Sequence, residues 1–324
     1  MIVDVHTRVF TSTDQLGGAA ERLRRGRGEP WRRVTATAED HDRAMARVDA
    51  ALILGFESRL LGASISHEQV AQCVQRNPRR YLGFAGIDPT AGDPVASLER
   101  ARALGMAGVT VSPAAAGFHP TDTRAMALFE AMEQHNIPLL VDPGTRWARE
   151  ARMEFGQPHL LDELARSLPR LKIVVAGLGH PFIDQGLALI AKHPTVFADL
   201  SELVLSPWQL YNTLVLAHQQ RVTDQLLFGS NFPLATPEQA IVTIYSVNTF
   251  VQGTHLPTVP REQLRSIVER DALRCLGLSA GPATDAGSAS VEAPASLPAA
   301  GDDQAPTSAE ADETEPASQS SVSS

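Results

Sequence analysis

Short apolar runs alternate with helical patterns along the first 280 residues of the chain. The runs are four to six residues long and almost continuously apolar, which is typical of strands buried on both faces of a parallel sheet. Eight such runs are recognisable, at residues 2–5, 50–55, 81–85, 108–111, 138–141, 172–176, 196–199 and 226–229. Eight strands alternating with helices predict a closed (β/α)8 TIM barrel. An open, doubly wound sheet is the alternative, and it is disfavoured because no glycine-rich phosphate fingerprint follows the first run.

The end of the chain differs in composition from the rest. Residues 281–324 are rich in Ala, Ser, Pro and Thr, have no Lys, Arg or aromatic residue, and contain eight of the acidic residues. Such a segment cannot bury enough apolar area to offset the entropy lost on ordering. We therefore predict a barrel domain over residues 1–280 and a disordered acidic tail over 281–324. The formal net charge is −9, so the predicted barrel is nearly neutral and its charge gives no clue to a substrate.

Several classes of protein are disfavoured by composition. The chain has two cysteines, Cys73 and Cys275, which are too few for a disulfide framework. It shows no signal-peptide pattern and no apolar run near the roughly 18 residues of a membrane span, so we expect a cytoplasmic protein without membrane contact. A near-neutral body also argues against nucleic acid as a partner. Six arginines between residues 22 and 33 form either a cationic lid for an anionic ligand or a solvated loop or subunit contact, the latter consistent with a homo-oligomer.

Polar residues gather where the predicted strands end. In a parallel barrel the catalytic groups come from the carboxyl ends of the strands, which meet at one face. The polar residues at these ends are Asp4, His6, Arg8, Ser112, Asp142, His180, Asp199, Ser201, Ser230 and Asn231. His6 and Arg8 stand two apart on the first strand and should therefore share one side of it.

Several ordered motifs give the chain a family resemblance. They include Ile2-Val-Asp4-Val-His6, Gly83-Phe-Ala-Gly-Ile-Asp88-Pro89, Gly177-Leu-Gly179-His180-Pro181 and Leu227-Phe-Gly229-Ser230-Asn231-Phe232-Pro233. Over residues 1–279 the chain resembles the amidohydrolase-2 (amidohydrolase-related) family. That family includes aminocarboxymuconate-semialdehyde decarboxylase, resorcylate-type decarboxylases and a metal-independent pyrone-dicarboxylate lactonase. The resemblance implies a TIM barrel that acts as a hydrolase or a carboxy-lyase.

The metal-ligand positions implied by this resemblance are mostly altered. The family pattern implies two histidines in the first motif, one after strand five, one in the strand-six motif, and an aspartate after strand eight. This sequence has His6 and Arg8, then Asp142, Gly177 and Asn231 in those places. An arginine has no lone pair for a metal, and one histidine plus one carboxylate falls short of the usual three or four ligands. We therefore expect no tightly bound metal, with zinc as a disfavoured alternative and with His6, Arg8, Asp142 and Asn231 as vestigial positions.

These residues suggest two functional hypotheses. Arg8 and Asp142 are expected to pair across the barrel, either as a structural staple or as part of an active site. In the active-site hypothesis Arg8 binds a substrate carboxylate with help from Ser112 and Asn231, while His6, Asp142 and His180 are the catalytic, proton-handling residues. The chain would then be a hydrolase of the amidohydrolase or lactonase type, or a carboxy-lyase, with a small carboxylated substrate. The alternative is an inactive barrel with a binding, assembly or regulatory role.

Overall fold

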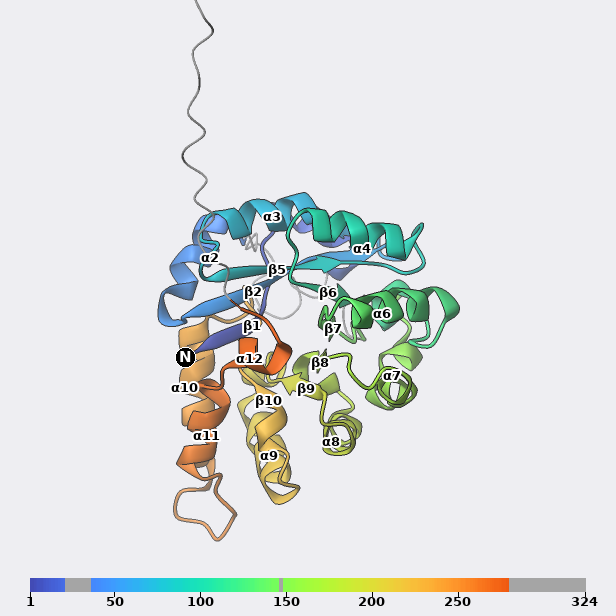
Figure 1. Cartoon of the computed structure of the whole chain (residues 1–324). Helices are drawn as coiled ribbons and strands as arrows, with labels where there is room; N and C mark the ends of the chain where they lie inside the picture. The colour runs from blue at the N-terminus through green and yellow to red at the C-terminus, as the bar shows by residue number, and fades with distance from the viewer. Residues whose placement is uncertain (21–35, 146–147, 280–324) are drawn as a thin grey trace, which may run out of the picture. The chain divides into compact units, whose positions relative to one another are not determined.

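The structure of the chain is a computed structural model that describes residues 1–20, 36–145 and 148–279 (Figure 1). The arginine-rich stretch between residues 22 and 33 lies outside the described residues. The predicted acidic tail, residues 281–324, also lies outside them, so its disorder and the domain boundary at residue 280 stay predictions.

The eight predicted strands all form, and they make one parallel sheet. They are β1 (Val3–Thr7), β2 (Ala50–Leu54), β5 (Tyr81–Gly86), β6 (Gly108–Val111), β7 (Leu139–Val141), β8 (Ile173–Val175), β9 (Val196–Asp199) and β10 (Leu226–Leu227), and they neighbour one another in that order. Hydrogen bonds join the last strand region to the first, from Val5 N to Phe228 O (3.0 Å) and from Asn231 N to His6 O (3.1 Å). The TIM-barrel prediction is therefore confirmed.

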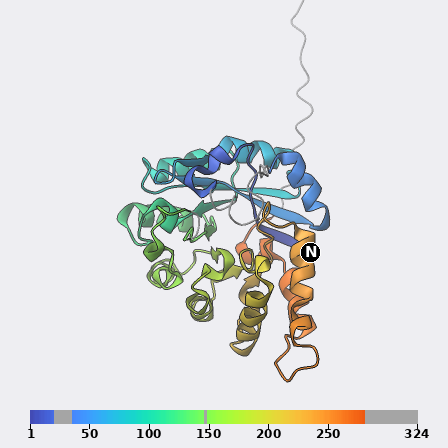
Figure 2. The same ribbon diagram turned by 180° about the vertical axis from the view of Figure 1, so that it is seen from behind.

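Helices surround the sheet, as Figures 1 and 2 show from opposite sides. The α-helices are α2 (Ala38–Ala44), α3 (His67–Gln75), α4 (Pro94–Ala103), α5 (Pro113–Ala116), α6 (Thr123–Gln134), α7 (Leu161–Ser167), α8 (Ile183–Lys192), α9 (Pro207–Gln219), α10 (Pro237–Tyr245), α11 (Arg261–Val268) and α12 (Ala272–Leu276). Short 3₁₀ helices are η1 (Thr13–Ala19), η2 (Met45–Arg47), η3 (Met153–Gly156), η4 (Pro158–Leu160), η5 (Ala176–Gly179), η6 (Leu203–Leu205), η7 (Thr223–Gln225) and η8 (Val247–Val251). None of the described helices is long and apolar enough to cross a membrane.

One element was not anticipated from the sequence. Strands β3 (Phe56–Ser58) and β4 (Ala63–Ile65) form a separate antiparallel hairpin directly after β2. Each hairpin strand is only three residues long, and Phe56 follows the barrel strand β2 after the single residue Gly55, so the sequence pattern showed no separate strand here. The hairpin carries Phe56, whose ring centroid lies 6.0 Å from the Arg8 guanidinium carbon.

An irregularity in β1 determines which side chains enter the barrel. Val3 and Val5 belong to the apolar cluster inside the barrel, together with Leu52 and Leu140. The pairing of β1 with β2 shifts register between Asp4 and Thr7, so the strict alternation of faces is broken there. As a result His6 reaches Asp199 at the end of β9, with only β10 between their strands, whereas the Thr7 hydroxyl lies 2.9 Å from His41 Nε2 of α2. The next polar side chain, Arg8, contacts His6, so the prediction that these two share a side is confirmed.

Candidate active site

His6 is the centre of a buried hydrogen-bonded network at the mouth, by which we mean the face formed by the carboxyl ends of the barrel strands. Its Nε2 lies 2.9 Å from Arg8 NH1 and its Nδ1 lies 3.1 Å from Asp199 Oδ2. A guanidinium can only donate hydrogen bonds, so Nε2 must be the acceptor and carries no proton. The ring proton is then on Nδ1 and is donated to Asp199. The contacts therefore favour a neutral imidazole with a defined tautomer.

Asp199 is an ionised carboxylate held at the end of β9. It is completely buried, and its Oδ1 accepts the backbone N–H groups of Gly177 (2.7 Å) and Ser201 (2.9 Å). Burial raises the pKa of Asp199, but the His6 imidazole, the Ser201 hydroxyl and the Gly177 N–H outweigh burial, and the pKa lies below its ordinary value. The sequence placed Asp199 at a strand end but gave it no role. The structure places it directly behind His6.

The predicted ion pair between Arg8 and Asp142 is present. Arg8 NH2 lies 2.6 Å from Asp142 Oδ2, and the two side chains are only 7% and 8% exposed. The other carboxylate oxygen of Asp142 accepts the Gly144 backbone N–H at 3.1 Å. The guanidinium thus joins His6 of β1 to the residue that follows β7.

The donor groups at the mouth do not fit a divalent metal ion in this arrangement. The two side chains best able to act as ligands, His6 and Asp142, both accept hydrogen bonds from Arg8. A dication bound to them would have to displace a buried, permanently charged guanidinium. Within the described ranges, no group of three or more His, Cys, Asp or Glu side chains could hold a metal ion.

Asn231 and Gly177 stand at two of the expected ligand positions, and both lie next to Glu202, a residue that the sequence analysis did not single out. The Asn231 Nδ2 donates to Glu202 Oε1 at 2.9 Å. A Cβ at Gly177 would lie 2.6 Å from both Cβ and Cγ of Glu202. Glu202 therefore occupies the space that a side chain at position 177 would need. Its only sequence signal is that it follows Ser201 directly after the seventh strand.

Ser112 and Thr110 contribute two buried hydroxyls near this network. Each residue is 2% exposed, and neither hydroxyl oxygen has a hydrogen-bond partner in the part of the chain that the structure describes. Ser112 directly follows β6, and Asp142 N bonds to the preceding residue, Val111 O, at 2.9 Å. Ser112 thus follows the residue that bonds to Asp142 in the sheet, and its substrate-binding role stays a prediction. A buried hydroxyl of this kind can bind a polar ligand group.

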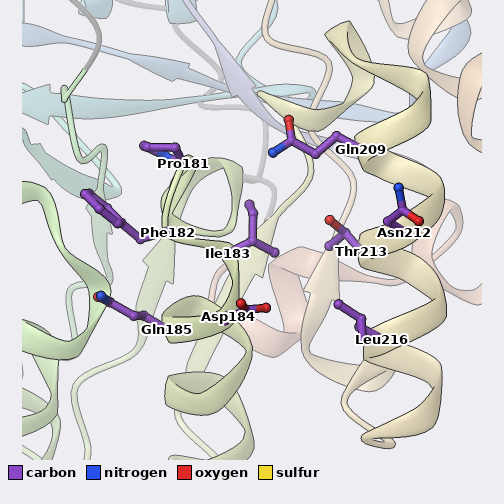
Figure 3. Close-up of a pocket in the computed structure, with 9 residues that line it drawn as sticks. All are labelled: Pro181, Phe182, Ile183, Asp184, Gln185, Gln209, Asn212, Thr213 and Leu216. Atoms are coloured by element: carbon purple, nitrogen blue, oxygen red, sulfur yellow. The ribbon is translucent and has the colours of Figure 1, made fainter.

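His180 makes contact on the outer side of the barrel. Its Nε2 lies 3.1 Å from Gln209 Oε1 of α9. Gln209 lines a groove of about 410 Å³ between the start of α8 and α9, together with Pro181, Ile183, Asn212 and Thr213 (Figure 3). The proposed proton-handling role of His180 stays a prediction.

Asp4 acts as a buried connector rather than a group open to ligand. It is 0% exposed, and its Oδ1 accepts the backbone N–H groups of His6 (3.1 Å) and Ser230 (3.0 Å). Burial raises the pKa of Asp4 to about 6, although the hydrogen bonds from Ser230 and His6 oppose this effect. Asp4 therefore links β1 to the end of β10.

Comparison with known proteins gives one family match and a set of similar structures. A family model described as Amidohydrolase matches residues 3–278. No curated protein sequence matches the chain. An uncharacterized TIM-barrel protein from Bordetella bronchiseptica is 18% identical with a TM-score of 0.63, and the match covers 85% of this chain and 98% of that one.

Two further structures carry functional names. A probable 2-pyrone-4,6-dicarboxylic acid hydrolase from Acinetobacter baumannii, with citric acid bound, is 15% identical with a TM-score of 0.58, covering 86% of this chain and 99% of that one. A dihydroxybenzoic acid decarboxylase from a Polaromonas species, with manganese and 2-nitroresorcinol bound, is 14% identical with a TM-score of 0.56, covering 85% and 96%. At these identities the likeness concerns the fold.

Proposed function

We propose, on the premise that the chain belongs to the amidohydrolase family, that it is a hydrolase or carboxy-lyase that acts on a small carboxylated substrate without a tightly bound metal. The observation that carries the proposal is the position of Arg8, whose guanidinium donates both to His6 Nε2 and to Asp142 Oδ2. A fixed cation thus stands between the two remaining candidate ligands. The names of the similar structures, a pyrone-dicarboxylic acid hydrolase and a dihydroxybenzoic acid decarboxylase, support a carboxylated substrate.

In this proposal the substrate carboxylate takes the place of Asp142 on Arg8. A guanidinium presents paired N–H groups that match a carboxylate, so the exchange replaces one strong ion pair with another. Asp142 then loses its counter-charge inside the barrel, which favours its protonation and makes it a proton acceptor.

The same exchange makes His6 available for chemistry. When Arg8 turns to the substrate, His6 Nε2 no longer accepts a hydrogen bond from it, and the lone pair of this nitrogen can accept a proton. In hydrolysis Nε2 takes a proton from water as the water oxygen forms a bond to the substrate carbonyl carbon, and the ionised Asp199 stabilises the resulting imidazolium. The imidazolium then gives this proton to the leaving oxygen as the bond from that oxygen to the carbonyl carbon breaks. In decarboxylation the carbon that loses CO₂ keeps the electron pair and takes the proton that Asp142 acquired when Arg8 left it. Ser112 and Asn231 supply further polar contacts.

One observation favours the alternative of an inactive barrel. The bonds of Arg8 satisfy His6 and Asp142 without any ligand, as a structural staple would. Under that hypothesis the mouth has no turnover, and the barrel serves binding, assembly or regulation.

Metal content and turnover test the proposal together. Protein expressed with Zn, Mn and Fe supplied should retain well under one equivalent of metal after dialysis, whereas stoichiometric metal would contradict the metal-independent part of the proposal.

Ultraviolet assays with 2-pyrone-4,6-dicarboxylic acid and dihydroxybenzoic acid should detect turnover in the wild type. Arg8→Lys should abolish this turnover, because lysine keeps the charge but loses the paired donors. Arg47→Lys, at an exposed pair with Glu238, is the control. A protein that neither converts nor binds these acids would support the inactive barrel.

A further inference from the structure

The part of the chain that forms α9, α10 and η8 is poor in charge. Residues 203–260 contain three charged side chains, Arg221, Asp224 and Glu238, although 20% of the whole chain is charged and about twelve would be expected in a stretch of this length. Seven of the eleven large apolar side chains that are exposed in the described residues also fall in this stretch. Few charges together with exposed aromatic side chains are typical of the core of a protein–protein interface.

The most exposed aromatic side chain of this stretch is Trp208. Its ring packs against Phe250 of η8, with the ring centroids 6.0 Å apart, yet 56% of Trp208 stays exposed. Leu256 adjoins Pro257, whose carbonyl oxygen accepts the hydroxyl of Tyr211 on α9 at 2.7 Å. We define the aromatic face by its exposed apolar members, Leu205, Trp208, Leu216, Phe250 and Leu256.

The apolar area of the aromatic face is close to what a stable dimer needs. Aromatic side chains of roughly 150–250 Å² each, at these exposed fractions, bring the face to about 400 Å² of apolar surface. A standard interface buries about 800 Å² per partner, of which about 65% is apolar in homodimers. The aromatic face alone would therefore supply most of the apolar area of such an interface.

The exposed side chains of α9 form a stripe along one side of the helix. Trp208, Asn212 and Leu216 are all exposed and are spaced by four residues, which places them above one another. Trp208 and Leu216 are about 12 Å apart along the helix axis, with Asn212 halfway between them. The groove of about 410 Å³ lies beside this stripe. Asn212 and Leu216 line it from α9, and Ile183 and Asp184 line it from α8 (Figure 3).

We propose that the aromatic face and the groove form the interface between two copies of this chain, with the α9 helices packed antiparallel about a two-fold axis at Asn212. Trp208 of each copy then lies over Leu216 and the groove of the other, and the two Asn212 side chains meet at the axis. The Asp184 carboxylate can accept the indole N–H of the incoming Trp208.

A second copy fits this face better than a different partner does. Each copy brings both the projecting ring and the groove, so a two-fold pairing fills both grooves at once, as an isologous interface requires. A face with so few charges also offers little for a strongly charged partner to recognise. The inference is independent of the chemistry at the mouth.

Sedimentation velocity of the full chain tests the interface. At tens of micromolar the wild type should have the mass of two chains. Trp208→Ala should raise the dissociation constant at least about tenfold, because a large aromatic side chain seated in a groove is a typical hot spot. Leu104→Ala shortens an exposed apolar side chain at the end of α4 and should leave the dissociation constant unchanged.

Charges at Asn212 test the position of the axis, because a residue on a two-fold axis faces its own copy. Asn212→Asp and Asn212→Lys should each raise the dissociation constant at least about tenfold by like-charge repulsion. An equimolar mixture of the two variants should form dimers again, since opposite charges then meet, and this recovery also shows that both variants are folded. Gln72→Glu, at an exposed position in α3, is the control for an added charge.

Three results would overturn the proposal. The first is a wild type that sediments as a single chain at these concentrations. The second is a dimer that tolerates either Trp208→Ala or the charges at Asn212, since its contact then lies elsewhere. The third is a mixture of Asn212→Asp and Asn212→Lys that does not recover the dimer, which would show that the two Asn212 side chains do not meet.

Discussion

Replacing Arg8 with alanine should destabilise the folded protein, because it leaves the Asp142 carboxylate buried without its cation. Both side chains are less than a tenth exposed, and their closest atoms are 2.6 Å apart. Breaking a buried pair from one side typically costs 3–5 kcal/mol. The Gly144 N–H still donates to Asp142 Oδ1 at 3.1 Å and offsets part of the loss. We therefore expect about 3 kcal/mol, which for a barrel of this size corresponds to a fall in Tm of roughly 6 °C or more.

The measurement is urea unfolding followed by circular dichroism, with an exposed arginine as the matched control. Arg47 pairs with Glu238 at 3.4 Å, but the two side chains are 68% and 64% exposed. Arg47→Ala should therefore cost less than about 1 kcal/mol. Arg8→Ala combined with Asp142→Ala should cost less than the sum of the two single variants, because the uncompensated charge is gone. An Arg8→Ala protein as stable as Arg47→Ala would refute the view that this guanidinium neutralises a buried carboxylate.

Three further predictions concern charge and packing. His41 packs against Tyr81 and Phe232, and its pKa is lowered to about 4, mainly by desolvation. The unfolded chain binds this proton near pH 6.5, so protons favour the unfolded state below that pH. The free energy of unfolding should therefore fall by about 2 kcal/mol through this group between pH 7 and pH 4.5. In His41→Gln that loss should vanish. The urea midpoint of the variant should therefore fall less between pH 7 and pH 4.5 than the midpoint of the wild type does, and an equal fall in both proteins would contradict the prediction. The pH dependence that Asp4 contributes has the opposite sign: with a pKa raised to about 6, Asp4 stabilises the folded protein at low pH, and this stabilisation is lost as the pH rises through 6. Between pH 7 and pH 4.5, Asp4→Asn should therefore lose about 2 kcal/mol more of its free energy of unfolding than the wild type does. Gly177→Ala should cost about 1–3 kcal/mol in thermal unfolding, and Glu202→Ala in the same chain should restore part of it; a tolerated Gly177→Ala would show that the two positions do not compete for space.

The fold was predictable because its signal is local and repeated. Each barrel strand is buried on both faces, so each is written in the chain as a short apolar run, and helical patterns separate these runs. The ion pair of Arg8 with Asp142 was also predictable, since both residues stand at strand ends and carry opposite charges. The hairpin of β3 and β4 was missed because each of its strands is only three residues long, and β3 begins one residue after β2 ends.

The chemistry of the site depended on contacts that no local pattern encodes. His6 and Asp199 are 193 positions apart, and closing the barrel brings them within 3.1 Å. The register shift in β1 turns His6 inward, and the placement of Glu202 depends on the empty space at Gly177.

The residue types alone establish which groups are available: a cationic Arg8 that cannot bind a metal, a single histidine at the first strand, and neutral residues at two expected ligand positions. How these groups are used depends on the folded structure. It set the tautomer of His6 through its two partners, kept Asp199 ionised despite burial, and placed the Glu202 carboxylate beside Asn231. The physical reason is that residue type fixes charge and hydrogen-bonding capacity, whereas protonation state and partner choice depend on distances that exist only when the eight strand ends meet.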